Sequence, residues 1–169
     1  MEMLQAIDPY SAARTDTESL FLAFHLAEQD YGIAITKVQE IREWSKVTPL
    51  PNSPPYIKGM LNLRGAIVPV IDLRMRFGLP PIEYDAFTVI IVANVGGRMA
   101  GIVADTVSDV VSAGADQRRP LPEFEGKANR QFIDGLVQLG ERLMILLNVD
   151  KLVNPEDLTV TTRPAVPAD

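Results

Sequence analysis

Residues 56–77 read YIKGMLNLRGAIVPVIDLRMRF, and this stretch decides the fold because a weaker copy, FIDGLVQLGERLMILLNVDKLV, follows at residues 132–153. A constant shift of 76 positions aligns the two without a gap and places Gly59 on Gly135. The alternating apolar positions survive as well. An internal repeat of this kind predicts two similar modules packed side by side.

A second alignment extends the repeat upstream of each copy. A shift of 69 positions aligns four pairs: Gly32 with Gly101, Thr36 with Asp105, Val38 with Val107, and Glu40 with Asp109. Chance similarity between hydrophobic strands is the alternative explanation, and the coincident glycines and capping position argue against it. Residues that occur in only one of the two repeats are then the candidates for a functional role, above all Asn62-Leu63-Arg64-Gly65.

The composition is that of a folded globular protein of 169 residues, with a formal net charge of −6 and no cysteine. The negative charge argues against nucleic acid and polybasic membrane binding, because both need clustered positive charge. No apolar run reaches the length of about 18 residues that a membrane-spanning helix needs, and the N-terminus does not resemble a secretory signal. We therefore expect a cytoplasmic protein with no direct membrane insertion, no disulfides and no thiolate metal site.

Alternating apolar residues bounded by turn signals predict many short strands. A hairpin is expected over residues 20–35, and further strands are expected at residues 60–63, 66–73, 87–95, 99–104, 132–139 and 143–149. Four prolines between Thr48 and Pro55 predict a rigid loop. Thr36 and Gln39 have the spacing of a capping box, so one helical turn is expected there, and Asp105 is a good capping residue at the matching position.

Short strands with only single helical turns favour small β-barrels over an α/β sheet. The sequence thus predicts an all-β fold of two five-stranded barrels packed side by side, with short helical segments and a cleft between the barrels. The first barrel is expected at about residues 20–85, with strand exchange left open, and the second at about residues 86–153. Mobile tails are expected at residues 1–17 and 159–169.

The sequence contains no evident catalytic or metal-binding constellation. His25 is the only histidine and lies in an amphipathic strand, and the glycine motifs of phosphate, dinucleotide and nucleophile-elbow sites do not occur. Asp105 and Asp109 could share a cation, but their repeats Thr36 and Glu40 favour capping and surface roles. We therefore expect a binding protein, not an enzyme, with no cofactor and no metal.

The equivalent segments 38–41 and 107–110 are the candidates for a binding surface. Each follows a predicted turn, and together they could line the cleft from both sides with an apolar floor. Ordinary barrel core is the alternative role for their valines. Glu40 and Arg64 supply opposite charges in the first module, and an ion pair between them would offset the desolvation of Arg64. The alternative role for Arg64 is that of an exposed turn residue.

Residues 30–78 closely resemble the CheW family of chemotaxis coupling proteins, and the likeness covers residues 20 to about 158. The most specific match is Asn62-Leu63-Arg64-Gly65 followed by VPVIDL at residues 68–73. The resemblance implies a pair of five-stranded SH3-like barrels within residues 18–158. The same fold forms the regulatory domain of the chemotaxis kinase CheA, and it occurs fused to a receiver domain in CheV proteins. Because neither a kinase nor a receiver segment is evident, we expect the stand-alone adaptor.

The resemblance also implies a function, namely a non-catalytic adaptor that couples the cytoplasmic tip of methyl-accepting chemoreceptors to the histidine kinase CheA in membrane-associated arrays. A receptor-binding groove would hold the helical hairpin of the tip, using Val38, Glu40, Arg64, Val89, Val107 and Val110. The regulatory domain of CheA would contact two places: Ile35, Lys58 and Gly59 in the first module, and Arg119 and Phe124 in the second. The ring-forming surfaces also allow self-association.

A small β-barrel enzyme or metabolite-binding protein with the same fold is the alternative function, since a fold alone does not decide function. The lack of a catalytic constellation in the sequence favours the adaptor.

Overall fold

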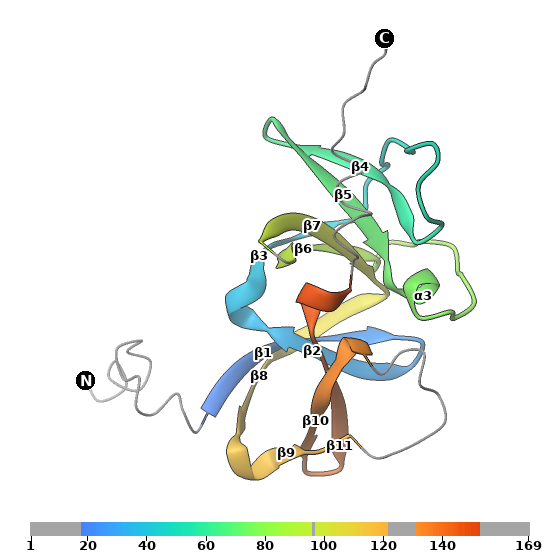
Figure 1. Cartoon of the computed structure of the whole chain (residues 1–169). Helices are drawn as coiled ribbons and strands as arrows, with labels where there is room; N and C mark the ends of the chain where they lie inside the picture. Colours follow the sequence, from blue (N-terminus) through green and yellow to red (C-terminus); the bar gives the residue numbers. More distant parts are fainter. Residues whose placement is uncertain (1–17, 96, 122–130, 153–169) are drawn as a thin grey trace.

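The computed structural model describes residues 18–95, 97–121 and 131–152. Within these ranges almost all regular structure is β, in two sheets that lie one above the other in Figure 1. The upper sheet, barrel 1, has the order β3-β6-β7-β5-β4: Val38–Glu43, Val89–Val95, Arg98–Ala104, Ala66–Asp72 and Ile57–Leu63. The lower sheet, barrel 2, has the order β8-β1-β2-β11-β10-β9: Thr106–Gly114, Glu18–Leu26, Gln29–Ala34, Arg142–Leu147, Ile133–Leu139 and Arg118–Arg119.

Short helical turns join strands in the described parts of the chain, among them η1 Ile35–Lys37, α3 Leu73–Arg76, η2 Ala115–Gln117 and η4 Val149–Lys151. The predicted fold class, two small β-barrel units with short helical segments, is confirmed. Barrel 2 differs from the expected five strands by the two-residue β9. The tails expected at residues 1–17 and 159–169 lie outside the described residues.

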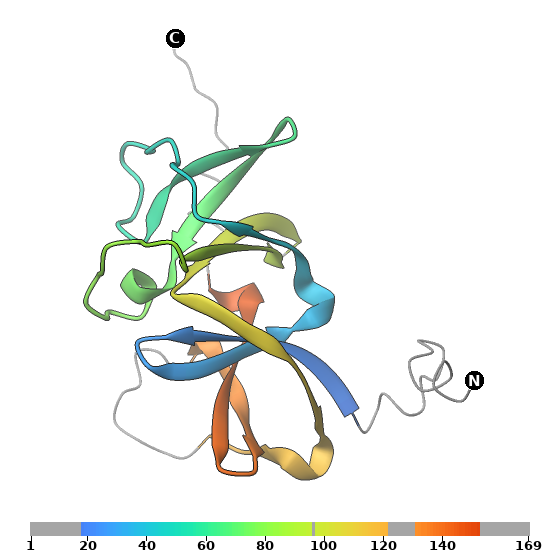
Figure 2. The ribbon, with the colours of Figure 1, turned by 180° about the vertical axis from the view of Figure 1, so that it is seen from behind.

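The barrels are not consecutive in the sequence, because each half of the chain contributes two strands to the other barrel. β1 and β2 lie in barrel 2 beside β8 and β11, and β6 and β7 lie in barrel 1 beside β3 and β5. The chain crosses between the barrels at η1, after β2, and at Asp105, after β7 (Figures 1 and 2). A division at residues 85 and 86 therefore does not describe the barrels, and the strand exchange that the sequence left open is present.

The sequence repeat reappears as a repeat of strand register. In barrel 1, β5 and β7 pair in parallel with Val70 opposite Gly101, and in barrel 2, β11 and β2 pair in parallel with Leu146 opposite Gly32. The shift of 69 positions likewise relates the β3–β6 pairs to the β8–β1 pairs: Val38–Ala93 to Val107–Phe24, and Ile41–Ile91 to Val110–Leu22. The two halves of the chain are thus structural repeats.

The two aligned glycines occupy equivalent β-bulges. Gly59 has a backbone φ of +155° and follows a register shift in the β4–β5 hairpin, and Gly135 has a φ of +153° and follows the same shift in β10–β11. L side chains rarely adopt this backbone conformation, whereas glycine does so readily. At Gly59 an added Cβ would also lie 2.2 Å from the carbonyl oxygen of Thr48.

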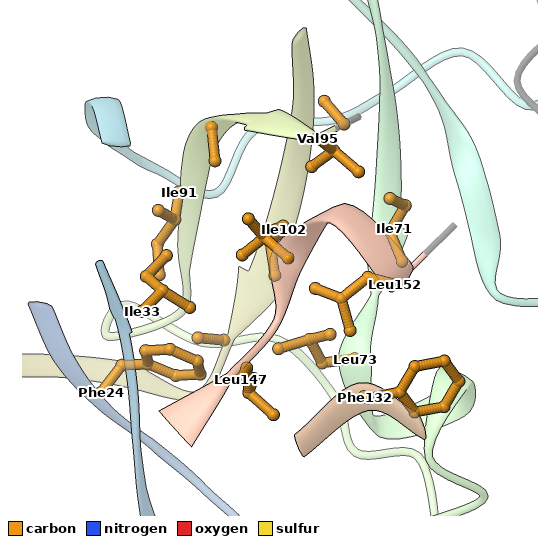
Figure 3. Close-up of a cluster of buried hydrophobic side chains, with 14 of the residues drawn as sticks. Phe24, Ile33, Ile71, Leu73, Ile91, Val95, Ile102, Phe132, Leu147 and Leu152 are labelled. Atoms are coloured by element: carbon orange, nitrogen blue, oxygen red, sulfur yellow. The ribbon is translucent and has the colours of Figure 1, made fainter. Parts of the chain in front are cut away.

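Apolar side chains form three clusters, one inside each barrel and a larger one between them. Leu61, Val68 and Val92 belong to the interior of barrel 1, and Phe21 and Met144 to that of barrel 2. The inter-barrel core gathers side chains from both sheets, from α3 and from the residues next to β10 and η4: Phe24, Ile33, Ile71, Leu73, Ile91, Val95, Ile102, Phe132, Leu147 and Leu152 (Figure 3). Because this core fills the space between the sheets, the barrels pack as one unit, and the open cleft expected from the sequence is replaced by packed side chains.

The capping predictions for the two crossovers were wrong. η1 begins at Ile35, its N-cap is Ala34, and no side chain caps it. Asp105 caps no helix. Its carboxylate instead accepts a hydrogen bond from the Ala27 backbone in the β1–β2 turn, at 3.0 Å. The carboxylate therefore ties the second crossover to barrel 2.

Candidate functional site: the rim between the barrels

The hypothesised ion pair between Glu40 and Arg64 is present. Arg64 lies at the tip of the β4–β5 hairpin with a φ of +51°, and Asn62 Oδ1 accepts a hydrogen bond from the Gly65 amide at 2.9 Å, which stabilises the turn. This turn directs the largely exposed Arg64 side chain toward β3, where Nη2 donates to Glu40 Oε1 at 2.8 Å. The unusual backbone of the motif thus positions one guanidinium.

Arg42 is a second cation at this carboxylate that the sequence analysis missed. Its Nη1 lies 3.3 Å from Glu40 Oε2, so Glu40 stands between two guanidinium groups. The hydrogen bond from Arg64 is the main cause that lowers the pKa of Glu40 below its usual value. The alternation of β3, which places residues 40 and 42 on one face, is the signal that could have found Arg42.

The four predicted groove valines lie at the edge of the inter-barrel core. Val38, Val89 and Val107 are half-buried and pack against this core, whereas Val110 is exposed. Val38 belongs to β3 and Val89 to β6 of barrel 1, and the other two belong to β8 of barrel 2. We call these four valines, contributed by β3 and β6 of barrel 1 and by β8 of barrel 2, the rim. It carries apolar side chains from both barrels, whereas Glu40 and Arg42 lie on the other face of β3, opposite Val92 and Ile90 of β6.

The structure places the predicted kinase-contact residues in separate regions. Ile35 lies in η1 and packs against the inter-barrel core. Lys58 lies on β4 with its Nζ 5.6 Å from the centre of the Tyr84 ring, beside the Gly59 bulge. Arg119 lies on β9 of barrel 2, exposed, with its Nη1 bonded to the carbonyl of Asp116 at 2.8 Å. Phe124 falls outside the described residues.

Barrel 2 carries a second charged network near the rim. Arg142 at the start of β11 donates through Nε to Asp30 at 2.7 Å and through Nη2 to Asp109 at 3.1 Å. His25 Nδ1 lies 2.7 Å from the other oxygen of Asp30. The hydrogen bond from Arg142 is the main cause that lowers the pKa of Asp109. In the described part of the chain, no three histidine, aspartate or glutamate side chains are placed to hold a metal ion together.

The described residues thus form a strand-exchanged pair of small β-barrels. The family model of the CheW-like domain matches residues 20–157. The chain therefore belongs to the CheW family of chemotaxis coupling proteins.

Individual relatives agree with this assignment. The chain is 48% identical over 145 residues to chemotaxis protein CheW of Klebsiella aerogenes, covering 86% of this chain and 87% of that protein. It is 31% identical over 155 residues to chemotaxis protein CheW of Bacillus subtilis, covering 92% and 97%. The crystal structure of the scaffolding protein TtCheW from Thermoanaerobacter tengcongensis superposes with a TM-score of 0.74 and 30% identity, covering 79% of this chain and 91% of that chain.

No helix among the described residues is long and apolar enough to span a membrane.

Proposed function

We propose that this chain is a non-catalytic adaptor that couples the cytoplasmic tips of chemoreceptors to the histidine kinase CheA and supports assembly of their arrays. Membership of a chemotaxis coupling family supports the general role. The single observation that carries the finer proposal is the Glu40–Arg64 pair, held at 2.8 Å on the same strand, β3, that contributes Val38 to the rim. Such a surface recognises another protein chain.

The receptor tip is proposed to bind at the rim. A helical hairpin presents apolar ridges flanked by charged residues, which suits partly exposed valines beside an ion pair. The half-buried Val38, Val89 and Val107 are supported from below by the packed core, so they are positioned before a partner arrives. A surface that is already ordered loses little conformational entropy on binding.

The regulatory domain of CheA is proposed to bind elsewhere, so that both partners can be held at once. One contact would use Ile35, Lys58 and Gly59, and the other would use Arg119 and Phe124 to close rings, where the chain can also associate with its own copies. Each contact is expected to be modest, with array strength arising from many simultaneous contacts. The adaptor would then work in the cytoplasm, recruited to receptors at the membrane.

Arg64→Ala tests the receptor surface. The variant removes the exposed guanidinium from a hairpin tip, so we expect the fold to survive and affinity for a receptor-tip hairpin to fall about tenfold or more, as for an interface charge that loses its partner. Arg98→Ala is the matched control, since Arg98 is an exposed arginine at the start of β7, next to another hairpin turn of barrel 1. Titration calorimetry of both variants measures the difference. Unchanged affinity of Arg64→Ala would show that the receptor binds elsewhere.

Phe124→Ser tests the second kinase contact. We expect this variant to bind the receptor tip as the wild type does and to assemble fewer arrays, measured by sedimentation of receptor, kinase and adaptor together. Arrays of normal extent would reject the role of Phe124.

A further inference from the structure

Each half of the chain depends on strands of the other half to complete its barrel. We call residues 18–80 the first half and residues 84–152 the second half. The strand pairs β3–β6, β5–β7, β8–β1 and β11–β2 all join one half to the other. Within the first half, the described strands pair only as the hairpins β1–β2 and β4–β5, apart from a single bridge between Thr48 and Met60. The strands of the first half therefore form no complete barrel by themselves.

Side chains also join the two halves. Arg74 of the first half pairs with Asp105 of the second at 2.8 Å, and Arg142 of the second half pairs with Asp30 of the first at 2.7 Å. The inter-barrel core likewise combines buried apolar side chains from both halves. None of these contacts requires the two halves to belong to the same chain, because each is non-covalent.

The covalent connection between the halves is short. The carbonyl of Pro80 accepts a hydrogen bond from α3 at 2.8 Å, which fixes the end of the first half. The Tyr84 hydroxyl donates to Asp72, and the Tyr84 ring lies 4.3 Å from that of Trp44, so the start of the second half is held against the first. Between these two fixed points lie residues 81–83, which are all exposed and run beside α3 on the outside of the molecule (Figure 2). We call these three residues the hinge.

The sequence of the hinge makes it stiff. Pro80 and Pro81 are consecutive, and a proline ring fixes φ near −65°. A residue that precedes a proline is also biased toward extended conformations. Short and rigid connections make it harder for a chain to fold back on itself, and they favour a form in which the connection runs straight on to another molecule.

We propose that two copies of this chain exchange their second halves at the hinge and form a dimer of two complete double barrels. Each double barrel then combines the first half of one copy with the second half of the other, and it keeps all four strand pairs and the inter-barrel core. Only the conformation of residues 81–83 differs between this dimer and the monomer. Exchange of identical elements leads to dimers without any new interface. The inference is independent of the proposed function, since it concerns how two copies of the chain are joined.

Protein concentration during folding decides between the two forms. Closure within one chain competes with capture of a second copy, and a short connection gives the attached half a local concentration on the order of millimolar. Dimers should therefore form on refolding at about 1 mM protein and be rare at about 1 μM. Once formed, the two forms interconvert slowly, because exchange separates all four strand pairs and the core, as unfolding does. They are therefore separable by size.

The test uses the absence of cysteine from the sequence, so that one introduced disulfide reports which chains are paired. Leu20→Cys with Ser112→Cys places thiols on exposed, directly opposed residues of β1 and β8, which belong to different halves. Gln138→Cys with Leu143→Cys is the matched control, because these exposed, opposed residues of β10 and β11 both belong to the second half. Opposed residues of antiparallel strands are close enough for a disulfide. Each full-length variant is refolded from urea at about 1 mM, oxidised with glutathione disulfide and separated by size-exclusion chromatography.

The dimer fraction gives the decisive result on a denaturing gel without reductant. The Leu20→Cys/Ser112→Cys dimer should remain covalently linked, whereas the control dimer should separate into single chains. Both monomer fractions should run as single chains, with loss of free thiols showing that the disulfides have formed. Single chains from both dimers would mean that the copies associate through their surfaces, and either this result or the absence of any dimer would overturn the proposal.

The hinge itself is tested by Pro81→Gly in the otherwise unchanged chain. Glycine lets the hinge turn back more easily, so the dimer fraction after refolding at about 1 mM should fall several-fold. An unchanged dimer fraction, measured by the same chromatography, would overturn the assignment of residues 81–83 as the hinge.

Discussion

The two crossovers between the barrels are equivalent in position and unequal in strength. At the second crossover, Arg74 of α3 donates two hydrogen bonds to the Asp105 carboxylate, from Nε at 3.0 Å and from Nη2 at 2.8 Å. At the first crossover, Lys37 of η1 reaches Asp150 of η4 at 3.1 Å. The 76-position shift that relates the repeats places Arg74 on Asp150, so the turn after each repeated hairpin supplies the charge, with opposite sign.

The difference lies in burial and in the number of bonds. The Arg74 and Asp105 side chains are 12% and 23% exposed, and Arg74 also donates to the Pro80 carbonyl at 2.8 Å. The Lys37 and Asp150 side chains are 36% and 44% exposed. A two-point arginine–carboxylate pair shielded from water holds geometry far better than an exposed lysine pair. The repeat thus gives the two crossovers equivalent positions in the fold. The more buried and more extensively hydrogen-bonded side chains make the second crossover the more stable of the two.

The largest effect on stability is expected at the two bulge glycines, which have the same backbone conformation but different surroundings. Gly59→Ala should lower the free energy of unfolding by more than about 3 kcal/mol, because positive φ and a clash with the Thr48 carbonyl combine. Gly135→Ala has the same φ but its Cβ would lie 3.3 Å from the Arg119 carbonyl, so a loss of about 1–2 kcal/mol is expected. Urea denaturation measures both, and equal losses would contradict the steric difference.

The ion pairs at the two crossovers are expected to give the next largest effect on stability. Arg74→Ala leaves the half-buried carboxylate of Asp105 without its cation and should cost about 3 kcal/mol, near the lower end for a pair broken inside a protein. Lys37→Ala breaks an exposed pair and should cost less than about 1 kcal/mol. The midpoint of urea unfolding reports each loss. A Lys37 variant as unstable as the Arg74 variant would refute the inequality of the two crossovers.

The smallest effect is the pH dependence of the firmer crossover. Burial acts to raise the pKa of Asp105, but the hydrogen bonds from Arg74 and the Ala27 amide outweigh it and leave this pKa below its ordinary 3.8. A folded-state pKa below the unfolded one means that the ionised carboxylate stabilises the fold above pH 3.8 and that this contribution is lost as the pH falls through the folded pKa. The stability difference between wild type and Asp105→Asn should therefore shrink on acidification below pH 3.8. A difference that stays constant in denaturation curves down to pH 2 would mean that Asp105 does not act through its charge.

Strand identity, the duplication and the Glu40–Arg64 pair were predictable from sequence because they depend on local signals. Alternating apolar residues and glycine-containing turns define the strands. A carboxylate and an arginine among apolar residues each need a partner of opposite charge. The swap of β1 and β2 for β6 and β7 was not predictable, since the repeat fits either pairing and only packing between distant strands decides. The role of Asp105 was missed for a similar reason. Its partners Arg74 and Ala27 belong to other elements of the fold, whereas a capping prediction depends only on residues adjacent in the sequence.

The bridging role is tested most directly by sedimentation of three components: a receptor-tip hairpin, the CheA regulatory domain and the full-length chain. We expect the receptor tip and the regulatory domain to sediment together only when the chain is present, and Arg64→Ala to release the receptor tip while the regulatory domain stays bound. If the two partners compete for the chain, or if either fails to bind, the chain does not couple them.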